Sequence, residues 1–290
     1  MSTDRAPADQ PLIATLFHRL VDDAAVFPPG NATLPDAVAA HRGHRSAWYA
    51  DLVGPLLVPA SSLDALAALL DPGERLAVGV VADVPVERLH VATDPRLDVR
   101  QVEAAVAKRG EDPQPGIARL LEVARRLPEH DVYAELPLTF GLLAGLDTVA
   151  EARRAGTRVA AKFRTGGLAA ELFPTPVELA AVICACRDRG LPFKLTAGLH
   201  HGLRHTDPET GFTHHGFLNV LVATALAAEG AEVAEVAEVL AATDAVPLIE
   251  PARARLRAER RLWVAFGSCS MMEPLTDLIR LGLVNGGYEG

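Results

Sequence analysis

Two of the three lysines in the chain stand in matching contexts. Lys162 lies in AKFRTGG and Lys194 in PFKLTAGLHH, and each lysine precedes a glycine turn by four residues. Elsewhere the sequence supplies positive charge almost entirely with Arg. A lysine amine, unlike a guanidinium, can lose its proton and attack a carbonyl carbon. The pattern therefore indicates a lysine pair suited to imine chemistry.

Short apolar runs that alternate with helical segments must position these lysines. The expected strands are AAVF, GPLLVPA, RLAVGVVAD, LDVRQVEAAV, DVYAELPL, RVAAKFRTGG, LPFKLTAG and LWVAFGSCS. The expected helices include TLPDAVAAHRGH with Thr33 as N-cap, 62–70, 115–127, 146–155, 175–189 and 274–282. Eight such units in about 250 residues are typical of an α/β fold, the (β/α)8 TIM barrel, with catalytic groups at the C-terminal strand ends. A doubly wound sheet is the competing fold, but no GxGxxG motif follows the first strand.

The barrel prediction treats residues 1–290 as one domain. A polar leader is expected over 1–16, and PLIATLFHRLVDD predicts a short amphipathic N-terminal helix. The stretch 199–261, between the seventh and eighth strands, predicts a His-rich loop and a long helical insertion with helices at 216–228 and 230–242.

Composition narrows the class of partner. The formal net charge of -9 disfavours nucleic acid, whose phosphates favour clustered Lys and Arg. No apolar run is long enough for a membrane span, the N-terminus does not read as a signal peptide, and the three cysteines cannot form a disulfide framework. We therefore expect a cytoplasmic protein that acts on a small molecule, with formation of a homo-oligomer left open.

The two lysines should influence one another. Neighbouring barrel strands lie about 4.8 Å apart, so two interior amines on adjacent strands come close together. Mutual repulsion and burial would then lower the pKa of at least one amine. The alternative is that a lysine pairs with an interior carboxylate such as Glu103 or Glu135 and only solvates the barrel mouth.

The C-terminal motifs resemble a known family. AKFRTGG, FKLTAGLHHGLR and AFGSCS resemble the last three strands of the deoxyribose-phosphate aldolases, which are class I aldolases. The resemblance implies that Lys162 forms a Schiff base with a carbonyl substrate and that Lys194 lowers its pKa. VRQVEAAV resembles the fourth strand of that family, which implies that Glu103 moves protons. LVDDAAVFPPGNAT resembles the first strand more weakly.

One departure from the family changes the expected substrate. Where the family has two glycines after the seventh strand, this chain has Gly198 followed by Leu199. A leucine narrows the turn and hinders close approach of a phosphate, so we expect a small carbonyl substrate other than the usual phosphosugar. The other candidate substrate-binding residues are Asp22, Arg164, Gly166, Gly167, Gly198, His200, His201, Gly267 and Ser268. For Arg164, a substrate clamp and an ion pair with Glu135 are both open.

A second chemistry is carried by the histidines of the 200–215 stretch. These are His200, His201, His205, His214 and His215, with Asp207, Glu209 and Cys269 as further candidate ligands of Zn or Fe. The sequence has neither the HxH nor the HExxH spacing of known metal sites, which weakens the case for a metal. The aldolase hypothesis therefore assigns no metal and no cofactor to the protein. The alternatives are a metal-dependent hydrolase or isomerase that adds Asp22 or Asp23, and a noncatalytic anion-binding barrel.

Overall fold

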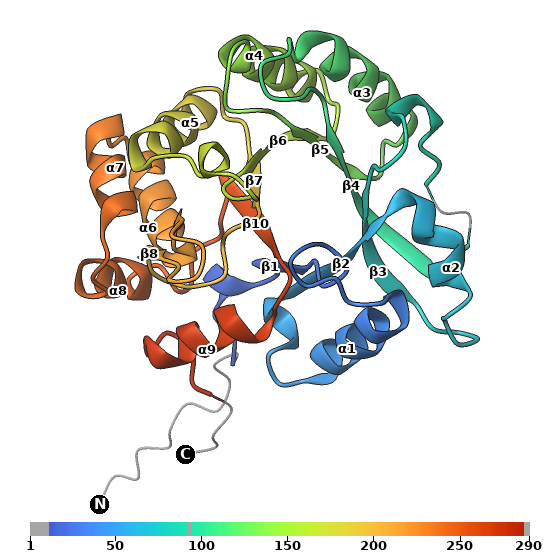
Figure 1. The fold of residues 1–290 in the computed structure, drawn as a ribbon, viewed down its shortest axis with the longest axis horizontal. Coiled ribbons are helices and arrows are strands. Elements are labelled where there is room, and N and C mark those ends of the chain that lie inside the picture. The colour runs from blue at the N-terminus through green and yellow to red at the C-terminus, as the bar shows by residue number, and fades with distance from the viewer. Residues whose placement is uncertain (1–11, 92–93, 287–290) are drawn as a thin grey trace, which may run out of the picture.

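Eight parallel strands close into a barrel in a computed structural model that describes residues 12–91 and 94–286 (Figure 1). The barrel strands are β1 (Val21–Asp23), β2 (Val53–Pro59), β3 (Leu76–Val81), β4 (Leu97–Ala105), β5 (Asp131–Glu135), β6 (Val159–Arg164), β7 (Phe193–Thr196) and β10 (Trp263–Ser268). Each strand pairs with its sequence neighbours in the barrel, and β1 closes the ring against β10. The predicted TIM-barrel architecture is confirmed.

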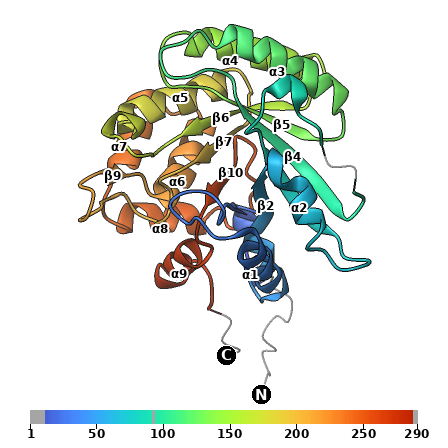
Figure 2. The ribbon, with the colours of Figure 1, turned by 45° about the vertical axis from the view of Figure 1, so that its right-hand side comes forward.

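Helices form the layer outside the strands. They are α1 (Leu34–Ser46), α2 (Leu63–Ala67), α3 (Gln114–Arg126), α4 (Leu142–Arg154), α5 (Pro176–Asp188) and α9 (Met272–Arg280). α3 and α4 lie side by side outside β4, β5 and β6 (Figures 1 and 2). Between β3 and β4 the described residues form only a 3-10 turn, Val86–Arg88, in place of a helix. No helix in the described part of the chain is long and apolar enough to cross a membrane.

Local sequence signals explain where two of the helices begin. Thr33 accepts a hydrogen bond from the backbone N–H of Asp36 at the start of α1, as the sequence predicts for an N-cap. Thr175 and Glu178 form a capping box at the start of α5, with Pro176 in the first turn. Both helices begin at the face of the barrel where the strands have their C-terminal ends. The caps therefore help to hold the loops that lead from β1 to α1 and from β6 to α5.

The segment from β7 to β10 contains more than one helix. It holds a two-stranded antiparallel hairpin, β8 (His205–Thr206) and β9 (Thr213–His214), and then α6 (Phe217–Ala228), α7 (Val233–Ala241) and α8 (Val246–Arg253). α6 and α7 correspond to the helices predicted at 216–228 and 230–242. The hairpin and α8 were not among the predicted elements. α6 and α7 lie beside α5 at the edge of the barrel, and α8 packs against α6 (Figure 1).

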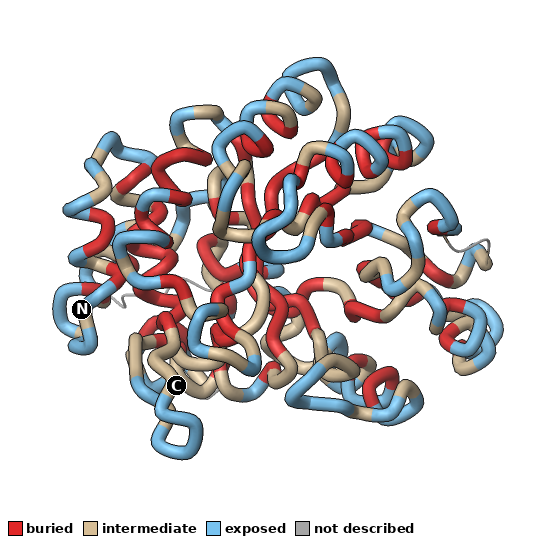
Figure 3. Tube along the Cα trace, turned by 45° about the horizontal axis from the view of Figure 1, so that its top comes forward, coloured by how far each residue is buried: buried red, intermediate tan, exposed pale blue. Residues whose placement is uncertain are grey.

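The core lies between the strands and the helices. Side chains that alternate with the inward-facing ones, such as Val102, Phe163 and Leu195, are fully buried against the helix layer. Figure 3 shows buried residues along the central strands and exposed residues on the outer turns of the helices. This apolar layer stabilises the closed barrel. The side chains that point into the barrel are not part of it, so they can be polar.

The N-terminal prediction is wrong in two respects. Over the described part of PLIATLFHRLVDD, only Thr15–Phe17 is helical, as a 3-10 turn, and Arg19 has a φ of 48° that breaks the helical path. Ile13, Leu16, Phe17 and Leu20 have helical spacing but bury their side chains as an irregular segment, where the Leu16 N–H donates to the Leu256 carbonyl. The first strand is Val21–Asp23, which begins three residues before the predicted strand AAVF and ends directly before it. Of the leader predicted over 1–16, residues 1–11 lie outside the described residues.

Candidate active site

Five charged side chains from five strands meet inside the barrel. Lys162 Nζ lies 2.6 Å from Glu103 Oε2 and 2.8 Å from Glu135 Oε2. Lys194 Nζ lies 2.6 Å from Glu103 Oε1 and donates a second hydrogen bond to Asp22. Glu103 therefore bridges the two amines, one with each carboxylate oxygen. We call Asp22, Glu103, Glu135, Lys162 and Lys194 the interior charge cluster.

Strand register and strand alternation bring these residues together. Glu135, Lys162 and Lys194 are Cα partners across β5, β6 and β7. All three point inward, because their sequence neighbours pack outward against the helices. Space for the cluster comes partly from glycine, since a Cβ on Gly54 of β2 would collide with the carboxylate of Asp22. The expectation that the two lysines are interior neighbours is confirmed.

The pKa values of the two amines are shifted in the direction opposite to the expected one. Burial alone lowers the pKa of Lys162, but the nearby carboxylates of Glu103 and Glu135 outweigh burial, and the pKa is raised. Burial likewise opposes Asp22 and Glu103 at Lys194, and the pKa is raised there too. Mutual repulsion of the lysines does not dominate because three carboxylates surround two amines. Both lysines are therefore ammonium groups at rest.

The carboxylates respond to the same balance of burial and charge. Burial raises the pKa of Glu103, but the two ammonium groups outweigh burial and lower the pKa to about 2. The pKa of Glu135 is also lowered, since Lys162 and Arg164 outweigh burial. The pKa of Asp22 is raised, because burial outweighs the attraction of Lys194. Asp22 is thus the carboxyl group in the cluster that most readily takes up a proton.

Two interior residues were not predicted as part of the site. Gln101 Nε2 donates to Asp22 Oδ2 at 2.8 Å and to Glu103 Oε1 at 3.0 Å. The Tyr133 ring lies with its centroid 4.8 Å from Lys194 Nζ, within cation–π range. A sequence signal for both exists, because Gln101 precedes Glu103 by two residues and Tyr133 precedes Glu135 by two, which is the period of one strand face.

The cluster lies between two cavities at opposite ends of the barrel. A pocket of about 280 Å³ lies at the C-terminal ends of β4, β5 and β6 and includes Glu135 and Arg164 in its lining. A larger cavity of about 1190 Å³ opens at the N-terminal strand ends and includes Asp22, Gln101 and Tyr133. TIM-barrel chemistry takes place at the C-terminal face, so the smaller pocket is the candidate substrate site although the other cavity is larger.

Arg164 and the glycine turns form the rim of that face. Arg164 is half-exposed, and its Nη1 lies 3.5 Å from Glu135 Oε1, so the ion pair weighed for it is present while its guanidinium still borders the pocket. The turns after β6 and β7 pack against each other, since a Cβ on Gly166 would lie 2.9 Å from the Cα of Gly198. Gly198 also has a φ of 78°. Its glycine identity therefore has a structural reason besides substrate contact.

Three other residues that were predicted to bind substrate pack against or bond to other parts of the protein. A Cβ on Gly167 would collide with the Leu172 side chain. Gly267 faces Leu57 and Thr196, and a Cβ there would lie 3.3 Å from Leu57 Cδ1. Ser268 is buried and donates its hydroxyl to the carbonyl of Ser270 at 2.8 Å. These residues shape the C-terminal face without joining the charge cluster.

The histidines of the 200–215 stretch have protein partners of their own, and the rings of His201 and His214 both pack against the ring of His205. His200 Nδ1 lies 3.0 Å from Glu273, and His201 Nδ1 lies 3.1 Å from Asp277. His205 and His214 stack on one another across the hairpin, and His215 bonds to a backbone carbonyl. Cys269 Sγ lies 4.0 Å from His200 Nδ1. Within residues 12–91 and 94–286, no three His, Cys, Asp or Glu side chains form a group that could hold a metal ion.

Asp23 points away from the cluster although it is adjacent to Asp22. Its Oδ2 lies 2.9 Å from Nδ1 of the buried His41 in α1, and its Oδ1 accepts from the Ala25 N–H. The alternation of the strand therefore separates the two aspartates, and only Asp22 faces the lysines.

Comparison with known proteins leaves the family open. No protein-family model matches the chain, and no curated protein matches it. The resemblance to class I aldolases therefore rests on the sequence motifs, and the chemistry must be argued from the interior charge cluster.

Proposed function

We propose that the protein is a class I aldolase-like carbon–carbon lyase that forms a Schiff base between Lys162 and a small carbonyl substrate. The observation that carries this proposal is the place of Lys162 Nζ between two carboxylates, Glu103 and Glu135, beside a pocket at the C-terminal face of a TIM barrel. TIM barrels are frequently enzymes, and a lysine with adjacent carboxylates has both the nucleophile and the proton acceptor that imine formation needs.

The raised pKa of Lys162 defines the first step. The ammonium group must transfer a proton to a neighbouring carboxylate before it can attack, and Glu103 and Glu135 are both within hydrogen-bonding distance. The neutral amine then adds to the carbonyl carbon, and loss of one water gives a protonated imine that carries the original positive charge. When the bond between the alpha and beta carbons breaks, that iminium accepts its electron pair and becomes an enamine. In the reverse direction the enamine donates the pair to a second carbonyl carbon, and the iminium forms again.

Glu103 and Lys194 have complementary roles in this scheme. Glu103 is in contact with the reacting nitrogen, so it can return the proton as the imine forms and hydrolyses. Lys194 holds the other Glu103 oxygen and stabilises its charged form. This role replaces the expected one, in which Lys194 would lower the pKa of Lys162.

Reductive trapping tests the proposal directly. Borohydride added with a panel of small aldehydes and ketones should give one adduct per chain, with the mass of the carbonyl compound less one oxygen, and peptide mapping should place it at Lys162. Lys162→Ala and Lys162→Arg should abolish the adduct. Lys108→Arg, at the exposed lysine that lines the same pocket, should keep the adduct, which shows that labelling is specific to Lys162. An adduct that persists in Lys162→Arg, or none with any carbonyl compound, would refute the proposal.

A noncatalytic barrel is the second candidate, and the raised pKa values of both lysines favour it. A buried cluster in which each ammonium has two carboxylate partners is also what a purely structural ion network contains. In that case charge alone matters, so Lys162→Arg would keep the ligand binding and the stability of the protein. The metal-dependent alternative has no supporting geometry in the described residues.

A further inference from the structure

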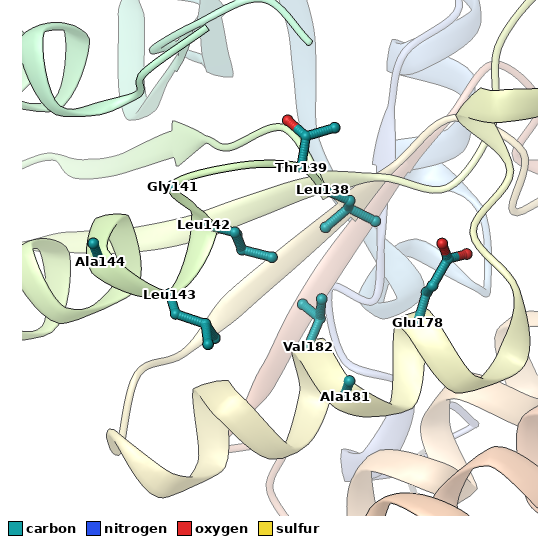
Figure 4. A pocket seen from close by; sticks show the side chains of 9 residues that line it. All are labelled: Leu138, Thr139, Gly141, Leu142, Leu143, Ala144, Glu178, Ala181 and Val182. Carbon is teal, nitrogen blue, oxygen red and sulfur yellow. The ribbon is translucent and has the colours of Figure 1, made fainter. Parts of the chain in front are cut away.

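The pocket at the C-terminal face continues into an apolar groove. The groove has a volume of about 470 Å³ and lies between the N-terminal halves of α4 and α5 (Figure 4). Leu138 and Glu178 line both the groove and the pocket that contains Glu135 and Arg164. The two spaces therefore adjoin one another, with a charged end at Glu135, which contacts Lys162, and an apolar end at the outer rim.

Aliphatic side chains form most of the groove. Leu142 and Leu143 come from α4, and Ala181 and Val182 come from α5, with Leu138 between the helices (Figure 4). Leu143 is 58% exposed, and the neighbouring Phe140 is 77% exposed. Ligand pockets are typically apolar with a few polar groups that fix orientation, and this groove with its polar end has that distribution.

The charged residue at the junction is held in place by the start of α5. Glu178 Oε2 accepts from the Thr175 N–H at 2.7 Å and from its hydroxyl at 2.9 Å. These hydrogen bonds hold the carboxylate at the start of α5 and lower its pKa. The junction therefore has one fixed, charged and exposed side chain, on the α5 side, and the rest of its lining that the two spaces share is Leu138.

We propose that the groove binds the apolar tail of the carbonyl substrate, so that the substrate class is an aldehyde or ketone with an alkyl or aryl chain. The inference rests on the proposed function, because a substrate tail can occupy the groove in this way only if the carbonyl group of the same molecule reacts at Lys162. Two features carry it: the continuity of the groove with the pocket beside Lys162, and its aliphatic lining.

A chain-length series tests the inference. Borohydride trapping is measured with acetaldehyde, butanal and octanal, and the half-saturating concentration is recorded for each. Each CH₂ group that enters the groove should lower that concentration about threefold to fourfold. Ala181→Phe, at an exposed alanine in the groove wall, should remove most of the ratio between octanal and acetaldehyde. Ala40→Phe makes the same change at an exposed site on α1 and should keep the ratio.

Octan-1-ol separates this inference from the proposed function, because it has the tail but no carbonyl group. Calorimetric binding of octan-1-ol that Ala181→Phe abolishes, together with trapping at Lys162, supports both. Such binding without any adduct supports the groove and refutes the Schiff base. Equal half-saturation for all three aldehydes, or a chain-length ratio that Ala181→Phe leaves intact, overturns the groove as a tail site even where adducts form. The absence of both an adduct and octan-1-ol binding overturns both.

Discussion

Glu103 is the residue that couples the two buried amines. Its two oxygens each contact one lysine, and Gln101 donates a further hydrogen bond to Oε1. A carboxylate buried among cations is stabilised mainly by those cations, and they in turn depend on it. Glu103 therefore sets both the resting charge of the cluster and, under the proposed function, the proton supply at Lys162.

The first prediction concerns the loss of that charge. Glu103→Gln keeps the shape of the side chain but leaves Lys162 and Lys194 with one carboxylate partner each. We expect the free energy of unfolding to fall by about 3 kcal/mol, because removing one member of a buried ion cluster leaves charge uncompensated. Urea denaturation measures this. Asp131→Asn, which breaks a half-exposed pair with Arg158, is the matched control and should cost less than about 1 kcal/mol.

The second prediction is the pH dependence of this difference. The pKa of Glu103 is lowered from its ordinary value of 4.5 to about 2 in the folded protein. Its contribution to stability is therefore fully present above 4.5 and is lost as the pH falls toward 2. The difference in unfolding free energy between the wild type and Glu103→Gln should shrink over that range. A difference that stays constant throughout would show that titration of Glu103 does not account for the stability that Glu103→Gln loses.

At the scale of elements, the sequence predicts what depends on local pattern. Most of the strands and helices lie within a few residues of their expected positions, because apolar alternation and helix caps are local signals. The first strand begins three residues before the predicted AAVF, because the prediction followed the apolar run and the strand contains two aspartates. Asp22 and Asp23 are strand residues because β1 pairs with β10, and their side chains have partners far away in sequence, Lys194 and His41.

His215 supplies the third prediction, because it joins the segment before α5 to the start of α6. Its Nε2–H donates to the Pro174 carbonyl at 2.7 Å, and its Nδ1 accepts from Arg204 at 3.3 Å, so the ring is neutral. Burial lowers the pKa of His215 from 6.5 to about 4. The stability it provides is thus present above 6.5 and lost as the pH falls toward 4, by about 2 to 3 kcal/mol.

Urea denaturation across that pH range measures the effect. His215→Gln can keep both hydrogen bonds but cannot be protonated, so most of this loss of stability should disappear in the variant. His90→Gln, at an exposed histidine, is the control and should keep the wild-type slope. If His215→Gln has the wild-type slope, the titration of His215 does not limit the stability of these elements.

At the scale of the whole molecule, barrel closure decides what the sequence could not show. The neighbouring lysines could be predicted, because β6 and β7 are consecutive barrel strands and both lysines have the same spacing to a glycine turn. The contact between Asp22 and Lys194 joins residues 172 positions apart and exists only once β1 has closed against β10. The raised pKa of Lys194 depends in part on that contact. The sequence indicated the two amines and left a pairing with Glu103 or Glu135 open, and in the folded barrel both of these carboxylates contact Lys162.

The last prediction asks whether the barrel needs the interior charge cluster in order to fold. Replacing a whole buried ion cluster by uncharged side chains of similar volume is often neutral or stabilising, whereas removal of one member is costly. We expect the combined variant Asp22→Asn, Glu103→Met, Glu135→Met, Lys162→Met, Lys194→Met to be within about 2 kcal/mol of the wild type, and more stable than Glu103→Gln alone.

Urea denaturation and near-ultraviolet circular dichroism check this outcome. A combined variant that folds as well as the wild type would show that the fold does not require the five charges, which agrees with their having a chemical role at Lys162. A variant less stable than Glu103→Gln would mean that the charges themselves hold the strands together. The barrel interior would then be a structural ion network, and the noncatalytic candidate would be favoured over the lyase.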